Sequence, residues 1–201
     1  MEFLLGEVGV IRCLILIVAA LAMLASVAKA DVCPGQVWAA SPDPTPPNSV
    51  SNIDLAGYIN QNSSWADGIK VSVEEHGDEL WLDVTEFPGT TVVVAAQRVI
   101  WLAARLSAGH QKKLVFADGG EGVFEIDELI IKDIGCRFVI GQQSGENPIA
   151  LLREFYDALD YYHTGLRVAP PFNGSLLGDT STAMAVNNDI FIPKWVLSAV
   201  K

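Results

Sequence analysis

Two pairs of alternating segments constrain the fold more than any other feature of this sequence. Apolar and polar residues alternate over residues 69–75 and again over residues 80–85, with Gly77 and Asp78 between them. Residues 113–117 and 123–126 repeat the pattern around the sequence DGGEG. A period of two indicates half-buried strands, and a short turn forces such strands to pair antiparallel. We therefore expect a sheet built from two β-hairpins.

A helix is expected between the hairpins, over residues 90–107. Thr90 or Thr91 can cap its first turn and Gly109 can end it. About two-thirds of its surface is apolar, which indicates a helix buried against the sheet. Trp101 lies in its narrow polar stripe, so either the N-terminal arm or the C-terminal tail covers this side chain, or it is exposed for a partner.

The remaining pattern completes an α+β class. A short helix is expected at residues 53–60, another at 127–134 closed by Gly135, a strand at 137–140, and a helix from Pro148 whose apolar face runs to Tyr162. The main order is ββαββ, short helix, β, α. This order predicts a small mixed or mainly antiparallel sheet with helices on one face.

The chain divides into four segments by composition. We assign residues 1–30 to a signal peptide, 31–52 to a proline-rich N-terminal arm or linker, 53–165 to the α+β domain and 166–201 to a C-terminal tail. The tail is rich in Pro, Gly and Asn but keeps many large apolar residues, which a disordered segment would lack. It is expected to be irregular, ordered and packed on the domain.

The N-terminal segment has the pattern of a secretory signal. An apolar run from Cys13 to Val27 is followed by Ala28-Lys29-Ala30, which is a typical cleavage sequence. The run is shorter than the roughly 20 residues of a membrane-spanning helix. We expect cleavage after Ala30 and export to the periplasm or the extracellular space, with an uncleaved inner-membrane anchor as the alternative.

Two cysteines would remain after cleavage, Cys33 and Cys136. In an oxidising compartment a disulfide between them would tie the N-terminal arm to the domain. The alternative is that Cys136 is a small buried core residue.

The net charge of −11 disfavours two classes of partner. Nucleic acid and anionic membranes are bound through clusters of Lys and Arg, which this chain does not provide. No membrane association is expected after signal cleavage, and the expected partner is a protein or a small ligand.

The DGGEG segment, residues 118–122, is expected to be a hairpin turn. Its carboxylates lack the spacing of an EF-hand calcium loop, and it lacks the lysine of a phosphate-binding loop. Asp-Gly and Gly-Gly accept the positive φ of a tight turn. We predict solvent-facing carboxylates here, and the sequence indicates neither a metal site nor a cofactor.

The weak candidates for catalysis are Ser144, His163 and Asp157. Ser144 lies between a predicted strand and a predicted helix, but its surroundings do not match the Gly-x-Ser-x-Gly elbow of hydrolases. A triad would need His163 as base and Asp157 as its orienting carboxylate.

The sequence favours an exported, soluble, non-catalytic protein that binds a partner or ligand. Its expected interaction surface is aromatic and comprises Trp101, Phe172, Phe191 and Trp195. The alternative is a periplasmic or secreted serine hydrolase that uses Ser144 and His163.

Export makes a direct prediction about the mature chain. Because the Ala-x-Ala sequence ends at Ala30, the mature protein is expected to begin at Asp31. Intact-mass spectrometry of protein recovered from the exporting host measures this end. A mass that includes residues 1–30 would favour the uncleaved anchor instead.

Overall fold

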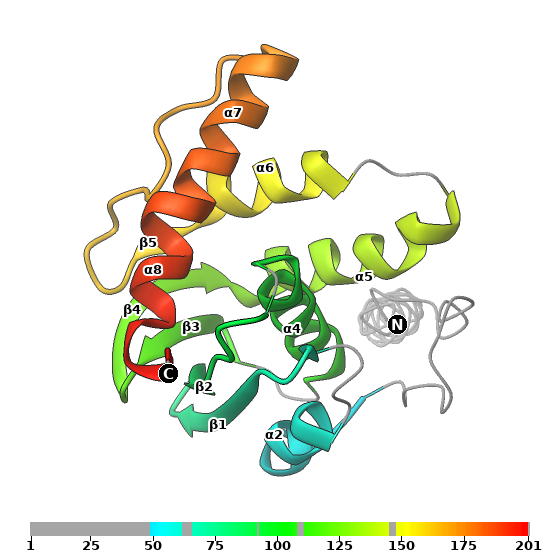
Figure 1. The fold of residues 1–201 in the computed structure, drawn as a ribbon, viewed down its shortest axis with the longest axis vertical. Coiled ribbons are helices and arrows are strands. Elements are labelled where there is room, and N and C mark those ends of the chain that lie inside the picture. Colours follow the sequence, from blue (N-terminus) through cyan, green and yellow to red (C-terminus); the bar gives the residue numbers. More distant parts are fainter. Residues whose placement is uncertain (1–48, 62–65, 92, 108–110, 145–147, 201) are drawn as a thin grey trace, which may run out of the picture. The chain divides into compact units, whose positions relative to one another are not determined.

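The computed structural model describes residues 49–61, 66–91, 93–107, 111–144 and 148–200 (Figure 1). The predicted signal peptide and most of the proline-rich arm, including Cys33, lie outside these residues, so cleavage and the Cys33–Cys136 disulfide stay predictions. Short π-helical and 3-10 segments occupy Asn187–Phe191 and Leu197–Ala199. The helices are α2 (Asn52–Gln61), α4 (Val93–Leu106), α5 (Glu128–Ser144), α6 (Pro148–Ala158), α7 (Leu176–Val186) and α8 (Ile192–Trp195), and the strands are β1 (Lys70–His76), β2 (Glu79–Glu86), β3 (Lys113–Asp118), β4 (Glu121–Asp127) and β5 (Asp160–Tyr161).

The strands form one mixed sheet in the order β1-β2-β3-β4-β5. β1 with β2 and β3 with β4 are the two predicted antiparallel hairpins, and β4 also pairs antiparallel with β5. β2 and β3 are parallel, and α4 is the helix of the crossover between them. The predicted α+β class with a mixed sheet is confirmed.

The strand register gives the sheet two chemically different faces. One face is apolar and includes a row of paired residues from four strands, namely Val73, Leu82, Phe116 and Phe124. The opposite face carries the row Glu74, Trp81, Val115 and Glu125. The apolar face therefore receives the helices and forms the core, and we call the opposite one the open face.

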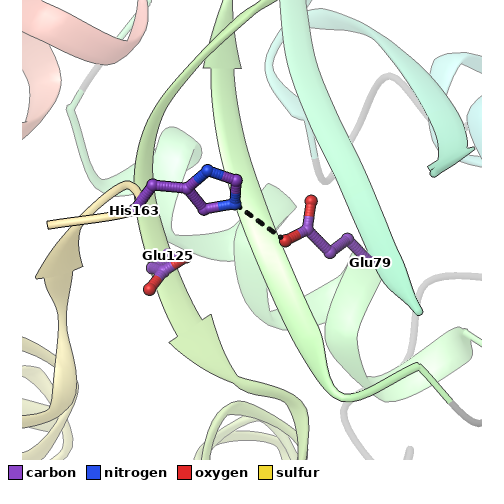
Figure 2. Close-up of side chains that lie close together, drawn as sticks. All are labelled: Glu79, Glu125 and His163. Atoms are coloured by element: carbon purple, nitrogen blue, oxygen red, sulfur yellow. Dashed lines mark ion pairs between the residues drawn. The ribbon is translucent and has the colours of Figure 1, made fainter. Parts of the chain in front are cut away.

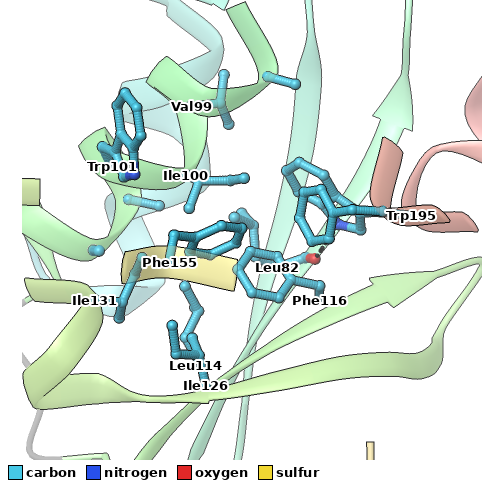
Figure 3. Close-up of a cluster of buried hydrophobic side chains, with 14 of the residues drawn as sticks. Leu82, Val99, Ile100, Trp101, Leu114, Phe116, Ile126, Ile131, Phe155 and Trp195 are labelled. Atoms are coloured by element: carbon cyan, nitrogen blue, oxygen red, sulfur yellow. Dashed lines mark hydrogen bonds between the residues drawn. The ribbon is translucent and has the colours of Figure 1, made fainter. Parts of the chain in front are cut away.

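Phe116 lies at the centre of this core (Figure 3). Its ring meets Phe155 of α6, Phe191 of the π-helical segment and Trp195 of α8 edge to face, with centroids 5.8, 5.1 and 5.3 Å apart. The indole Nε1 of Trp195 also donates to the Leu82 carbonyl at 3.1 Å. Edge-to-face packing aligns ring quadrupoles favourably, so one β3 side chain joins the sheet to the C-terminal helices.

The predicted break at Gly135 and the predicted strand at 137–140 are wrong. One helix, α5, runs from Glu128 to Ser144, and the Asp127 carboxylate caps its start by accepting from the Leu129 N–H at 2.8 Å. A Cβ on Gly135 would lie 2.9 Å from the Trp101 carbonyl oxygen of α4. The glycine therefore permits a close helix crossing and does not end the helix.

α6 is shorter than its apolar pattern predicts. It ends at Ala158, and the chain turns into β5, where Tyr161 lies opposite Phe124. The Tyr161 N–H donates to the Leu166 carbonyl at 2.9 Å, so residues 160–167 form a tight hairpin along β4. His163 therefore lies in a turn, not on a helix.

The C-terminal tail is ordered as expected but is helical instead of irregular. The Ser175 hydroxyl caps α7, and the buried Asp179 carboxylate accepts from the N–H groups of Asn173 and Gly174. Arg153 of α6 donates to Asp179 at 2.8 Å. A buried charge network fixes the start of α7 although the segment before it is rich in Pro, Gly and Asn.

The end of the tail lies against the two hairpins. Gly119 and Gly120 have positive φ, which confirms the predicted turn between β3 and β4. The Asp118 carboxylate accepts from the backbone N–H of Ser198 at 2.9 Å and from its hydroxyl at 2.6 Å. The Asp118 carboxylate was expected to face solvent. Instead, its hydrogen bonds with Ser198 hold the C-terminal segment against the β3–β4 turn.

The predicted aromatic interaction surface is wrong for three of its four residues. Trp101 is 4% exposed, and Phe191 and Trp195 are 0% exposed. Phe138 of α5 packs against Trp101, with ring centroids 4.0 Å apart. Phe172 is half-buried and lies near Arg153.

No helix in residues 49–200, outside the gaps given above, is long and apolar enough to cross a membrane.

The helix crossing at Gly135 predicts opposite effects for two glycine substitutions. Gly135→Ala is expected to lower the free energy of unfolding by about 1–3 kcal/mol, because the methyl group must displace the α4 backbone. Gly57→Ala, in α2, meets no atom within 4 Å and is expected to raise it by about 0.4–1 kcal/mol. Urea unfolding curves measure both, and a stabilising Gly135→Ala would contradict the crossing.

Candidate functional site

Four aromatic side chains cover part of the open face. The His76 ring stacks on Trp81 with centroids 4.5 Å apart, and Tyr162 meets Trp81 edge to face at 5.4 Å. His163 stacks on Tyr162 at 3.8 Å. We call these four rings the aromatic layer. It joins β1 and β2 to the hairpin that follows α6.

Gly122 of β4 lets Tyr162 reach the centre of this face. A Cβ on Gly122 would overlap the Tyr162 ring, which lies directly on the strand backbone. The Tyr162 N–H donates to the Val123 carbonyl at 3.0 Å, and the next residue, His163, has a φ of 55°. Such left-handed backbone is uncommon outside glycine. The main-chain hydrogen bond and this turn together orient the rings of Tyr162 and His163 towards β2.

Glu79 of β2 is the carboxylate on which these rings converge. Its Oε2 accepts from the Trp81 indole at 2.9 Å and from the Tyr162 hydroxyl at 3.0 Å, and its Oε1 lies 3.5 Å from His163 Nε2. Burial raises the pKa of Glu79, but the donors Trp81, Tyr162 and His163 lower it by more, so the net pKa lies below its ordinary value. Glu79 is therefore ionised at neutral pH.

Tyr162 is the matching donor. Burial, followed by the hydrogen bond to the Glu79 carboxylate, raises the pKa of Tyr162 to about 12. The phenol is therefore protonated at neutral pH and holds one Glu79 oxygen in place.

Glu125 of β4 is a second carboxylate beside Glu79, and it is only 6% exposed. Its Oε1 accepts from Lys113 Nζ at 2.6 Å. Its Oε2 is also buried, and among the residues that the structure describes it has no hydrogen-bond partner. An unsatisfied buried carboxylate oxygen is costly and is rare in folded proteins. Within the group of residues around Glu79, this oxygen is therefore the polar atom that calls for a partner.

Glu79, Glu125 and His163 come together in space (Figure 2). One ligand atom from each, a carboxylate oxygen or an imidazole nitrogen, lies within 4.8 Å of the other two. We call these residues the Glu–Glu–His cluster. Carboxylate and imidazole together are ligands that suit a divalent transition metal with an open coordination position.

A cavity of about 190 Å³ lies next to Glu125. Four of its five charged residues form two ion pairs, Lys113 with Glu125 at 2.6 Å and Arg167 with Asp160 at 3.4 Å, and the fifth, Asp127, caps α5. Its walls therefore offer both signs of charge together with an apolar part. The full lining is Lys113, Glu125, Ile126, Asp127, Ile130, Ala158, Asp160 and Arg167.

A smaller hollow of about 40 Å³ lies on the other side of Trp81. Asp83 is its principal polar group and accepts from the Gly120 N–H at 2.7 Å. Burial raises the pKa of Asp83, against the lowering effect of the N–H donors of Gly120 and Gly119. The volume suits one or two small molecules the size of water. The other lining residues are Ser72, Glu74, His76, Trp81, Ala117 and Gly120.

The predicted triad is not assembled in the way that sequence spacing suggested. Ser144 is the last residue of α5, whose C-terminal end lies at the right of Figure 1, whereas β5 and the hairpin that carries His163 lie at the left. Asp157 is exposed on α6, and the carboxylate next to His163 is Glu79. His163 thus belongs to the open face.

Sequence reasoning missed the Glu–Glu–His cluster for a geometric reason. Alternation alone places Glu79 and Trp81 on one face of their strand, and a corresponding count places Glu125 on one face of β4. Only the parallel register of β2 with β3 brings the two carboxylates together. The helix from Pro148 was expected to run to Tyr162, so nothing in the pattern directed the next residue, His163, to this face.

Comparisons with known proteins add no family. No family model matches the chain, and no curated protein or solved structure is significantly similar to it. The open face and the cavity beside it are therefore the features from which a function can be inferred.

The lowered pKa of Glu79 predicts a pH-dependent contribution to stability. Its folded pKa lies below the ordinary value of 4.5, so the ionised carboxylate stabilises the fold at neutral pH. That contribution disappears as the pH falls through the lowered pKa. Glu79→Gln is therefore expected to cost more stability at pH 7 than at pH 3, as measured by urea unfolding at both values.

Glu121→Gln is the matched control, because Glu121 is an exposed residue at the start of β4. Its effect is expected to be small at both pH values. An equal loss of stability for Glu79→Gln at pH 7 and pH 3 would contradict the ionised, hydrogen-bonded state of Glu79.

Proposed function

We propose that this protein is an exported, non-catalytic binding protein that takes a small ligand carrying both a positive and a negative group, such as a free amino acid. The observation that supports the proposal is the cavity beside β4, whose two cations each pair with a carboxylate of the same cavity, Lys113 with Glu125 and Arg167 with Asp160. A ligand with both charges can place its negative group beside a cation of the cavity and its positive group beside a carboxylate. Each charged side chain then keeps a partner of opposite sign, so no buried charge is left uncompensated.

The chemistry of the walls supports this class of ligand. Lys113 and Arg167 can receive a carboxylate, and Asp160 and Glu125 can receive an ammonium group. Ile126, Ile130 and Ala158 offer contact for the carbon part of the ligand. The volume of 190 Å³ equals that of about six water molecules at ~30 Å³ each, which favours a ligand well below drug size.

The wider features of the chain agree with this proposal. The predicted signal peptide suits a protein that meets small solutes outside the cytoplasm. The net charge of −11 disfavours nucleic acid. The serine-hydrolase alternative gains no support, because His163 pairs with Glu79 and lies away from the end of α5 that carries Ser144.

Ligand binding predicts a gain in thermal stability. A ligand that binds the folded chain alone adds about 2.7 kcal/mol at one hundred times its Kd. A panel of L-amino acids at millimolar concentration, screened by thermal unfolding, is expected to raise the Tm with at least one member. Simple diacids and diamines of similar size, which carry one sign of charge, are expected to give smaller shifts.

Two variants place the binding in this cavity. Lys113→Gln and Arg167→Gln are each expected to weaken binding at least tenfold by calorimetry, because each removes a cation of the cavity wall. Lys112→Gln is the matched control, since this neighbouring lysine is exposed and pairs with Asp78 outside the cavity. Equal affinity in all three variants, or no Tm shift with any amino acid, would overturn the proposal.

A further inference from the structure

We propose that the Glu–Glu–His cluster on the open face is a Zn²⁺ site, with ligands from Glu79, Glu125 and His163. This inference does not depend on the cavity ligand, because Glu79 and His163 do not line the cavity. Glu125 is the one residue that the two sites share. The zinc site would use Glu125 Oε2, which has no partner among the described residues, whereas Oε1 pairs with Lys113 of the cavity.

The spacing of the ligand atoms suits a tetrahedral ion. Zinc bonds of about 2.0–2.2 Å to nitrogen and oxygen place neighbouring ligand atoms roughly 3.3–3.5 Å apart. Glu79 Oε1 and His163 Nε2 are already 3.5 Å apart. One oxygen of Glu125 lies within 4.8 Å of a ligand atom of each of the other two residues, so we expect a rotamer adjustment of this side chain to close the set.

The buried oxygen of Glu125 is an independent observation in favour of a cation. Lys113 neutralises one carboxylate of the pair, and its ammonium group contacts only Oε1. Oε2 is buried without a partner among the described residues. Two carboxylates against one lysine leave a net negative charge in a largely buried place, and a divalent cation would satisfy both the charge and the orphaned oxygen.

The surrounding residues orient the ligands in the way that metal sites require. Trp81 and Tyr162 hold Glu79 Oε2, so Oε1 is the oxygen turned towards His163. The stack of His163 on Tyr162 fixes the plane of the imidazole. Hydrogen bonds and contacts of this kind, outside the ligand set, typically change metal affinity 10–100-fold.

The ligand types select the kind of ion. Calcium and magnesium prefer a shell of oxygen atoms, whereas an imidazole with carboxylates suits zinc and its neighbours in the first transition row. Three protein ligands leave a fourth position for water or another small ligand. The site is thus expected to prefer Zn²⁺ and to accept Co²⁺ as a spectroscopic substitute.

Zinc titration of the mature chain tests the proposal. Competition with a chromogenic chelator at pH 7 is expected to give one Zn²⁺ per chain with a Kd below about 10 μM, a threshold chosen as an order of magnitude for a three-ligand site. Co²⁺ is expected to give visible absorption bands of a four- or five-coordinate ion. His163→Ala and Glu79→Gln should each weaken Zn²⁺ binding at least tenfold and remove the Co²⁺ bands.

His76→Ala is the matched control. This histidine lies on the same face, stacks on Trp81 and faces Glu74 at 3.1 Å, but it is outside the cluster. Its loss should leave Zn²⁺ affinity within twofold. Circular dichroism verifies that each variant is folded.

Three outcomes would overturn the zinc site. They are no Zn²⁺ binding by the mature chain, unchanged affinity in both cluster variants, or an equal loss in His76→Ala. Arg167→Gln separates this proposal from the binding function, because it should weaken amino-acid binding and leave Zn²⁺ binding intact. Failure of either proposal is therefore visible without the other.

Discussion

The parallel pairing of β2 with β3 is the constraint on which the rest of the structure depends. It joins two hairpins that are each local in sequence into one sheet, in the register that sets Leu82 beside Phe116 and Trp81 beside Val115. The first pair completes the apolar floor on which α6, the π-helical segment and α8 pack. The second pair puts Glu79 and Glu125 on one face. Core and candidate site are consequences of the same main-chain register.

The two faces of this sheet are covered by different means. Helices bury the apolar face around Phe116, whereas a layer of four rings covers part of the open face. The ring layer brings hydrogen-bond donors to this face, the Trp81 indole and the Tyr162 hydroxyl. A partly buried carboxylate can therefore be held on the open face. In Glu79, one oxygen accepts two hydrogen bonds from the rings.

Local sequence patterns predicted the elements that are set by neighbouring residues in the chain. They failed where a contact between residues far apart in the sequence sets the end or the type of an element. Both hairpins and α4 followed from alternation, turn residues and helical periodicity. Gly135 was taken for a helix end, because only the crossing with the Trp101 backbone explains a glycine inside α5. α6 ends at Ala158, before the end of the apolar pattern at Tyr162, because residues 160 and 161 pair with β4 as strand β5.

The sequence by itself determined the α+β class, the two hairpins and the acidic charge of the chain, because these depend on residues close together along the chain or on composition alone. Only the tertiary structure decided which aromatic residues are buried and which carboxylates meet. Trp101 and Trp195 were expected at a surface and lie in the core. Glu79, Glu125 and His163 lie far apart in the sequence and share one site, because strand register and a left-handed turn, which no local pattern encodes, set their positions.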